Sequence, residues 1–279
     1  MSSGAPSLVQ AGPQAIRYAR EVQLQTADDV WTRIEALARK TPGGLVATDG
    51  DGTLWSGDVG EDLFHAFLDH GRVEPAAMQA LRGIARAHRL SDAGTGSDIA
   101  RRIYAAYLDG IYPEEGTCEL MTWCIAGWTR AEVQQFARDV VGGGTLAKRL
   151  HGEVHSVLSR ARAAGIECVL VSASPIAVVL EAGDRVGFDA SHVVGALPRY
   201  EGDRMLPDVE RPIPYGDGKM LRLRERIGHG RPIYAAFGDN GFDVALLSGS
   251  SVPVAVRPKA KLRARAGEVA GLVELAPLG

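Results

Sequence analysis

The chain has 279 residues, of which 46% are hydrophobic and 23% are charged, a balance typical of a soluble globular protein. Its formal net charge is -3 at pH 7, which gives no indication of the clustered basic excess that nucleic-acid-binding proteins usually carry. No segment approaches the roughly 18 consecutive apolar residues of a membrane-spanning helix. The first residues also lack the basic and apolar regions of a secretory signal, so we expect a cytoplasmic protein.

Residues 1–40 are predicted to form a lead and one helix packed on the core. The lead is rich in Gly, Pro, Ser and Gln, and apolar residues at helical spacing follow at Val22, Val30, Ile34 and Leu37.

Short apolar segments rich in Val and Ile recur along the rest of the chain. Their length without alternation is typical of strands covered on both faces, as in a parallel sheet. We therefore predict an α/β fold. The segments are GLVATD (44–49), ECVLVSAS (167–174), HVVGAL (192–197), PIYAAFGD (232–239) and VPVAV (252–256).

About ninety residues with helical spacing separate the first two of these segments, and this block is too long for a loop. We predict a helical cap domain at residues 57–150, inserted into an α/β core domain made of residues 41–56 and 151–279. Near the end of the block, residues 142–144 are all glycine and form either a hinge or a helix C-cap followed by a surface turn. The turn-rich residues 195–219 are predicted to form an irregular hairpin.

Two further features have plain interpretations. Cys118, Cys124 and Cys168 have no C-x-x-C spacing, so we interpret them as buried thiols in a reducing compartment and expect neither a disulfide nor zinc. The one basic cluster, residues 257–267, is interpreted as a solvated helix face.

Asp49 and Asp51 follow the first predicted strand and are separated only by Gly50. Two carboxylates this close repel each other, so they need a cation, a shared proton or access to water. The carboxyl ends of strands in open parallel sheets are where ligands bind. Gly50 and Gly52 would let the chain bend around such a ligand, although turns and calcium loops are built from similar residues.

The second predicted strand ends at Ser172. Ser174 and Pro175 are predicted to be the N-cap and the first residue of the following helix, and a helix N-terminus beside a hydroxyl is an anion site. Capping accounts for Ser174 alone, so Ser172 is the candidate ligand-binding hydroxyl.

A later strand ends at Asp239, and Asp243 follows four residues on. If these side chains enter the same crevice as Asp49 and Asp51, the charge density requires a cation. Magnesium fits best because it prefers oxygen ligands, whereas the lack of nearby His or Cys disfavours zinc. Lys219, predicted at a helix start, is a candidate for the compensating charge.

Four motifs in chain order carry a family resemblance: Asp49-x-Asp51-x-Thr53, Ser172, Lys219 and Gly238-Asp239-x-x-x-Asp243. Over residues 44–256 the chain resembles the haloacid dehalogenase (HAD) superfamily. More narrowly, it resembles the phosphoserine-phosphatase-like branch (subfamily IB), which has a helical cap between the first and second motifs. The resemblance implies a Rossmann-like, doubly wound parallel sheet as the core. The chain departs from phosphoserine phosphatases in having SAS at Ser172 and Phe242-Asp243, where they commonly have SGG and Asn-Asp.

The resemblance also implies a role for each motif residue. Asp49 would be the nucleophile that becomes an aspartyl-phosphate, and Asp51 would be the general acid and base. The Asp49 carboxylate, the Asp51 backbone carbonyl and Asp239 would bind Mg²⁺, with Asp243 in support.

The phosphoryl oxygens would be held by Ser172, the backbone N–H of Ala173 and Lys219, and Thr53 would brace the loop. Superfamily members that displace halide lack a carboxylate at the position of Asp51, because halide needs no proton on leaving.

A magnesium-dependent phosphatase acting on a small-molecule phosphomonoester is therefore expected, with no nucleic acid or membrane partner. The alternatives are a phosphotransferase with an alcohol or nucleoside acceptor, or a non-catalytic phosphate-binding regulatory protein.

Substrate selection is assigned to Trp55, Asp58 and Glu61. The acidic pair could receive the amine of phosphoserine, phosphoethanolamine or phosphocholine. Alternatively, Asp58 is a helix N-cap and Glu61 its capping-box partner, which the spacing favours. Trp123 and Trp128 either line the pocket or belong to the core, as tryptophans in helical segments more often do.

Overall fold

The computed structural model of the chain describes Tyr18, residues 22–143 and residues 145–278. The predictions for residues 1–17 and for Gly144 lie outside this part. The chain divides into two compact units. The first unit comprises residues 1–56, 150–169 and 219–279, and the second unit comprises residues 57–149 and 170–218.

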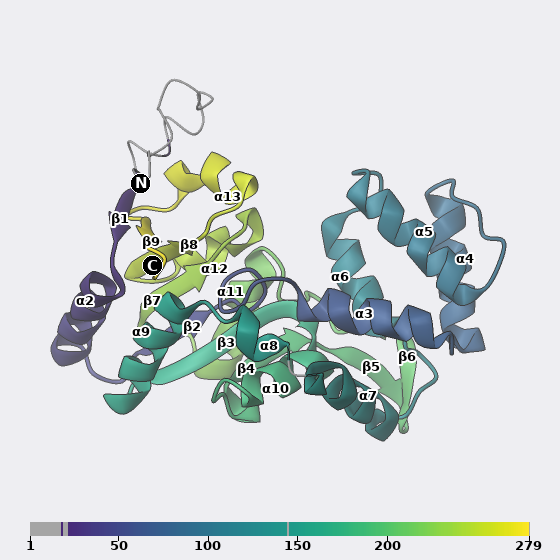
Figure 1. Cartoon of the computed structure of the whole chain (residues 1–279), viewed down its shortest axis with the longest axis horizontal. Coiled ribbons are helices and arrows are strands. Elements are labelled where there is room, and N and C mark those ends of the chain that lie inside the picture. Colours follow the sequence, from purple (N-terminus) through teal and green to yellow (C-terminus); the bar gives the residue numbers. More distant parts are fainter. Residues whose placement is uncertain (1–17, 19–21, 144, 279) are drawn as a thin grey trace, which may run out of the picture. The chain divides into compact units, whose positions relative to one another are not determined.

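A seven-stranded parallel sheet confirms the predicted α/β fold (Figure 1). In spatial order its strands are β1 (Gln23–Gln25), β9 (Val273–Leu275), β8 (Val252–Val256), β7 (Ile233–Gly238), β2 (Leu45–Thr48), β3 (Glu167–Pro175) and β4 (Val193–Ala196). Every residue of β2, β7 and β8 is buried. Such burial explains why these segments are continuous runs of apolar residues without alternation.

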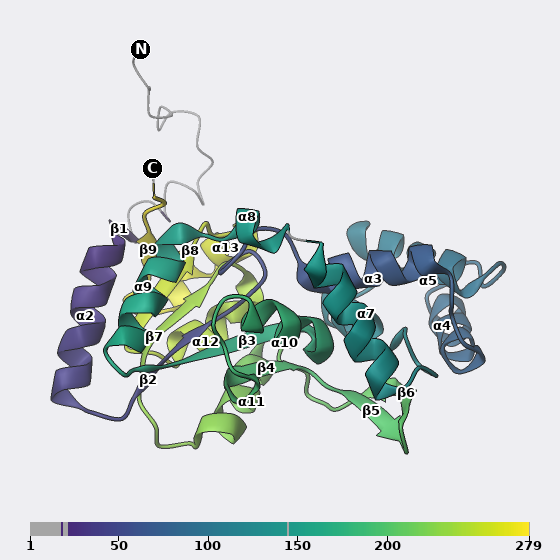
Figure 2. The ribbon, with the colours of Figure 1, turned by 60° about the horizontal axis from the view of Figure 1, so that its bottom comes forward.

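Helices in the first unit flank these strands. Helix α2 begins with a capping box in which Thr26 and Asp29 bond reciprocally, and it buries Val30 and Ile34. It packs against α9, and the two lie side by side in both ribbon views (Figures 1 and 2). The helical segments are α2 (Ala27–Lys40), α9 (Gly152–Ala163), α11 (Asp217–Ile227), η3 (Gly241–Asp243), α12 (Val244–Ser248), α13 (Ala260–Ala264) and η4 (Ala266–Glu268).

The second unit contains the long helical block. Between β2 and α9 the described residues form helices and no strand, whereas the assignment of this block as a cap, with its boundaries, stays a prediction. Capping boxes start α5 at Thr95 and α7 at Thr129. The helices are α3 (Val59–His70), α4 (Pro75–Ala87), α5 (Gly96–Leu108), α6 (Glu114–Trp123), α7 (Arg130–Gly142), α8 (Leu146–Arg149), α10 (Ile176–Asp184) and η2 (Ala190–His192).

The predicted hairpin is present in the second unit. Strands β5 (Pro198–Glu201) and β6 (Arg204–Val209) pair antiparallel and form a separate two-stranded sheet. Helix α7 ends at Gly142 with Gly143 as its C-cap residue, which agrees with the capping interpretation of the glycine run. No helix in the described part of the chain combines the length and the apolar character needed to cross a bilayer.

Two boundary predictions are wrong. Val22 lies outside the first long helix, because the Thr26 cap starts α2 at Ala27 and the preceding residues form the short edge strand β1. Ser174 is not a helix N-cap, because β3 continues through Pro175, which itself precedes the first helical residue, Ile176.

Candidate functional site

Asp49 and Asp239 leave neighbouring strands at the same edge of the sheet. The Asp49 N–H donates to the Phe237 carbonyl at 2.9 Å, which continues the parallel pairing of β2 with β7 by one residue. Asp239 follows the last residue of β7 directly, and both aspartates are almost fully buried. The shared strand edge therefore brings together two carboxylates that are 190 residues apart in the chain.

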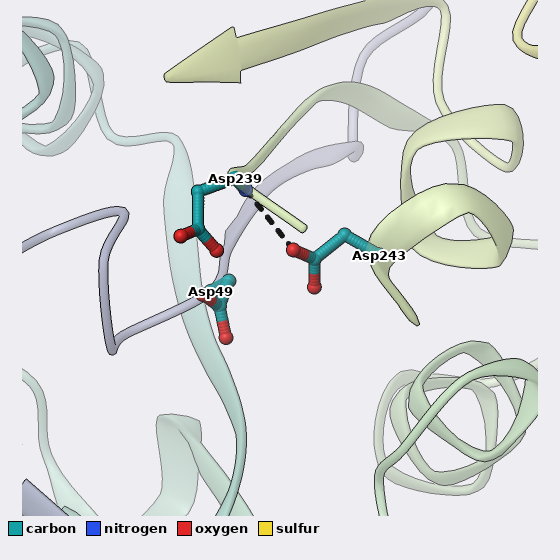
Figure 3. Close-up of side chains that lie close together, drawn as sticks. All are labelled: Asp49, Asp239 and Asp243. Atoms are coloured by element: carbon teal, nitrogen blue, oxygen red, sulfur yellow. Dashed lines mark hydrogen bonds between the residues drawn. The ribbon is translucent and has the colours of Figure 1, made fainter. Parts of the chain in front are cut away.

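Asp243 completes a group of three carboxylates (Figure 3). One oxygen from each of Asp49, Asp239 and Asp243 lies within 4.8 Å of the others. Asp243 comes from the short helix η3, and its Oδ2 accepts hydrogen bonds from the backbone N–H groups of Asp239 (3.0 Å) and Asn240 (2.8 Å). These bonds fix the Asp243 carboxylate against the turn that carries Asp239.

Lys219, the third residue of α11, is fully buried beside this group. Its Nζ donates to Asp49 Oδ1 at 2.6 Å and to Asp243 Oδ1 at 2.5 Å. The Lys219 ammonium also lies 4.7 Å from the centre of the Phe242 ring. The structure thus places the predicted compensating charge between two of the three carboxylates.

Burial and crowding disfavour the charged forms of this acidic group despite the lysine. Burial raises the pKa of the Asp49 carboxyl well above its usual range, and the nearby carboxylates raise it further, although Lys219 opposes them. Burial and Asp243 raise the pKa of Asp239 to about 6. Burial alone would lower the pKa of Lys219, but Asp243 and Asp49 outweigh it, so the lysine stays charged.

Two unpartnered carboxylate oxygens indicate that this group binds a cation. In the described part of the chain, no hydrogen-bond donor reaches the buried atoms Asp49 Oδ2 and Asp239 Oδ1. Buried carboxylate oxygens are rarely left without a partner. A hard divalent cation such as Mg²⁺ takes oxygen ligands of this kind and retains positions for water or phosphate, so the residues fit the predicted metal.

Asp51 is oriented by Trp55. The indole Nε1 of the fully buried Trp55 donates to Asp51 Oδ1 at 2.8 Å. The Gly50 carbonyl accepts hydrogen bonds from the N–H groups of Thr53, Leu54 and Trp55, which closes the loop on itself. The sequence predicts a role for Trp55 in substrate selection, whereas its burial and its hydrogen bond favour a role in holding the Asp51 carboxylate.

Thr53 sits inside this closed loop. Among the described residues no partner reaches its buried Oγ1, whereas its carbonyl lies 2.8 Å from His151 Nδ1. Burial lowers the pKa of His151, which favours the neutral ring. His151 had no assigned role in the sequence, because it is remote from every motif.

Lys259 is a site residue that the sequence did not reveal. Its Nζ lies 2.8 Å from Asp239 Oδ2, so this residue of the basic cluster pairs with a buried carboxylate although its side chain is exposed, as the solvated interpretation of residues 257–267 predicts. Gly52, at φ 82°, is the reason for the close approach: a Cβ there would lie 2.2 Å from Asp239 Oδ2. The sequence could have indicated Lys259 by its position, because it follows β8 just as Asp49 and Asp239 follow the neighbouring strands β2 and β7.

The second unit holds the predicted phosphate-binding serine. Ser172 is buried in β3, and its Oγ accepts from the N–H of Ser174 at 3.0 Å. The Ser174 hydroxyl in turn donates to Asp58 Oδ1 at 3.5 Å. Ser172 and Ala173 belong to the second unit and the acidic group to the first, so their joint action on a phosphoryl group stays a prediction.

Acidic side chains in the second unit are bonded to tyrosines. Asp58 is the N-cap of α3 and accepts from the Glu61 N–H at 2.9 Å, which confirms the N-cap part of the capping interpretation and leaves the capping box with the Glu61 side chain unconfirmed. The Glu61 carboxylate accepts from the Tyr104 hydroxyl at 2.7 Å, and Glu114 accepts from Tyr215 at 3.2 Å.

Tyr107 completes this tyrosine and carboxylate cluster, which comprises Asp58, Glu61, Tyr104, Tyr107, Glu114 and Tyr215. Burial, Glu114 and Glu61 together raise the pKa of Tyr107 to about 12. Trp123 and Trp128 are both buried, in agreement with the core interpretation.

Comparison with known proteins gives a family and several related folds. A family model described as haloacid dehalogenase-like hydrolase matches residues 46–248. A protein of unknown function from Bordetella pertussis Tohama I has a similar structure, with a TM-score of 0.62, 22% identity, and coverage of 83% of this chain and 97% of that chain. No curated protein sequence matches the chain.

Two other solved structures are also similar. A HAD family hydrolase from Salmonella enterica subsp. enterica serovar Typhi has a TM-score of 0.51 and 14% identity, with 91% of this chain and 75% of that chain covered. A phosphoserine phosphohydrolase-like protein from Francisella tularensis subsp. tularensis SCHU S4 has a TM-score of 0.50 and 13% identity, with 82% and 94% covered. At these identities the likeness is one of fold.

Proposed function

The chain belongs to the haloacid dehalogenase-like hydrolase family, and on that basis we propose that it is a magnesium-dependent phosphatase of a small-molecule phosphomonoester. The observation that carries the proposal is the buried group of Asp49, Asp239 and Asp243, with Lys219 bonded to two of them and two carboxylate oxygens left unpartnered. A purely structural ion network would have no reason to leave those oxygens without partners.

Asp49 has the geometry of a nucleophile. Lys219 fixes the carboxylate through Oδ1, and one oxygen of this carboxylate would attack phosphorus and form an aspartyl-phosphate while the bond to the leaving alkoxide breaks. Asp51, oriented by the Trp55 indole, would donate a proton to that alkoxide. It would then take a proton from the water that hydrolyses the intermediate and releases inorganic phosphate.

Asp49 and Asp239 would hold the metal, together with the Asp51 carbonyl, and Asp243 would orient the turn that carries Asp239. When bound, Mg²⁺ would supply charge neutralisation for the phosphoryl oxygens. Thr53, Ser172, the Ala173 N–H and Lys219 would bind those oxygens. Lys219 suits this task because both its charge and its position are fixed by buried carboxylates.

Replacement of the nucleophile tests the reaction. We expect the wild-type protein to hydrolyse phosphomonoesters with Mg²⁺ and not with a chelator, and Asp49→Asn to lose at least about a thousandfold in rate because it cannot form the aspartyl-phosphate. Asp109→Asn, an exposed carboxylate at the end of α5, is the matched control and should be fully active. Full activity in Asp49→Asn would refute the proposal.

The same assay separates the alternative functions. With an alcohol or nucleoside added, a phosphotransferase would yield a new phosphoester in place of inorganic phosphate. A non-catalytic binding protein would bind phosphoesters and turn none of them over.

We further propose that the substrate carries an amine, with selection by the tyrosine and carboxylate cluster of the second unit. Two of its carboxylates, Glu61 and Glu114, accept hydrogen bonds from tyrosine hydroxyls, and aromatic rings beside them favour a cation. A panel that compares phosphoserine, phosphoethanolamine and phosphocholine with sugar phosphates and nucleotides tests this. Equal rates across the panel would show that the cluster does not select for an amine.

Cytoplasmic residence also remains a proposal. It is in keeping with the three cysteines, all of which are free thiols, although Cys118 is partly exposed and not buried as predicted.

A further inference from the structure

Asp239 is held by Lys259 through both backbone and side chain. The Lys259 N–H donates to the Asp239 carbonyl at 2.8 Å, and the Lys259 ammonium lies 2.8 Å from Asp239 Oδ2. The turn after β8 is thus fastened to the turn after β7, at the carboxylate that the proposed function assigns to the metal.

The backbone around Lys259 is fixed by its neighbours. Arg257 has φ 43°, in the left-handed region that residues other than glycine seldom adopt. Its guanidinium donates twice to Oε1 of the buried Glu153, at 3.0 and 2.9 Å. The Pro258 carbonyl accepts from Arg263 Nε at 2.9 Å. The main chain of this turn therefore keeps its place whatever the Lys259 side chain does.

The Lys259 side chain differs from that of Lys219 in its route to solvent. Lys219 is fully buried and bonded to two carboxylates, whereas the Lys259 side chain is 54% exposed. The Lys259 ammonium can therefore move from Asp239 into water without crossing the core. Long basic side chains readily keep their charged end solvated in this way.

The ion pair lies beside the position that a metal would need, because Lys259 is on Oδ2 of Asp239 and the unpartnered oxygen is Oδ1. Asp239 Oδ2 faces Gly52 of the loop that carries Asp51, and a Cβ on Gly52 would lie 2.2 Å from that oxygen and 3.2 Å from Lys259 Nζ. A divalent cation bound to the Asp239 carboxylate would lie close to the Lys259 ammonium, and the two positive charges would repel each other.

We propose that Lys259 is the counterion of Asp239 in the metal-free protein and yields to the divalent cation, so that this lysine lowers the affinity of the site for magnesium. The inference rests on the proposed function, since it takes Asp239 as a metal ligand. Lys259 would keep the buried Asp239 carboxylate paired whenever the metal is absent, since an unpaired buried charge is strongly destabilising.

Magnesium titration by calorimetry tests this without any assay of activity. Lys259→Met removes the competing charge, so its Mg²⁺ dissociation constant should be about tenfold lower than that of the wild type, whereas Lys259→Arg should stay close to the wild type. Lys261→Met, two residues away on α13, removes the same charge from an exposed position and is the matched control. It should change the dissociation constant by less than about twofold.

Thermal unfolding gives a second readout. With a chelator present, Lys259→Met should melt below the wild type because Asp239 is left unpaired, and saturating Mg²⁺ should close that gap. Equal Mg²⁺ affinity in Lys259→Met and the wild type, or an equal gain in Lys261→Met, would overturn the inference. A wild-type protein that binds no Mg²⁺ would instead refute the proposed metal site itself, and Asp239→Asn provides the reference for that result.

Discussion

The two compact units hold their acidic side chains in different ways. In the first unit, Asp49, Asp239 and Asp243 are buried together, and lysine ammonium groups neutralise part of their charge. In the second unit, Glu61 and Glu114 accept hydrogen bonds from tyrosine hydroxyls, which satisfy the oxygens without cancelling the charge. The first arrangement suits a resident metal and covalent chemistry, and the second suits a cation that arrives with the substrate.

The largest expected effect comes from removing Lys219. Lys219→Met keeps the length of the side chain but leaves Asp49 and Asp243 buried without their partner, so we expect a loss of about 3 to 5 kcal/mol in the free energy of unfolding. Urea unfolding with a chelator measures this loss. Adding Asp243→Asn to Lys219→Met should recover part of the stability, because one of the two uncompensated charges is then gone. A double variant no more stable than the single one would show that the charges of the first unit are not coupled in this way.

The next largest effect tests whether the Trp55 indole orients Asp51 for proton transfer. Trp55→Phe preserves the buried ring and removes the N–H that holds Asp51 Oδ1. We expect turnover of alkyl phosphates, whose leaving groups need a proton, to fall by about tenfold, and turnover of nitrophenyl phosphate to change much less.

Trp123→Phe, in the core of the second unit, is the control for losing a buried indole. Equal losses on alkyl and aryl substrates in Trp55→Phe would mean that its indole does not serve proton transfer.

A smaller effect is expected in the second unit. Glu61→Gln keeps the acceptor for Tyr104 but removes the charge, so kcat/KM for amine-bearing phosphoesters should fall by about fivefold relative to amine-free ones. Asp62→Asn, the next residue of α3, removes the same charge from a side chain paired with Arg149 and should leave the ratio unchanged. If both variants shift the ratio equally, the effect belongs to the overall charge of the helix and not to the cluster.

The smallest effect is a pH dependence of stability. Burial lowers the pKa of His151 below its ordinary value of 6.5, so the folded protein binds this proton less well than the unfolded chain does. The contribution of neutral His151 is therefore complete above pH 6.5 and decreases as the pH falls below it.

His151→Gln retains an N–H for the Thr53 carbonyl but does not titrate in this range. Melting temperatures measured from pH 7.5 to 5.5 should fall less steeply in the variant than in the wild type. Parallel curves would exclude His151 as a source of the dependence.

The sequence sufficed for the parallel sheet and for the acidic group because both follow from local patterns. Buried parallel strands are continuous apolar runs, and Asp49 and Asp239 meet because residues that follow adjacent parallel strands share an edge. The edge strand β1 and its neighbour β9 have three residues each, and β1 is largely exposed, so neither forms a long apolar run.

The parts of the site that were missed depend on contacts without any local pattern. Lys259 reaches Asp239 only because Gly52 leaves room, and Tyr104 bonds to Glu61 although the two are 43 positions apart in the chain. The bond from Trp55 to Asp51 spans four residues, yet it requires the loop to close on the Gly50 carbonyl. Such contacts become visible only when the fold has placed the backbone.

Strand β3 has its first three residues in the first unit and its last six in the second. Neither unit is a continuous stretch of chain, so no single cut would release either of them whole, and exchange between relatives would require several crossovers at once. The tyrosine and carboxylate cluster itself comes from both stretches of the second unit, so exchange of residues 57–149 alone would separate Tyr215 from Glu114.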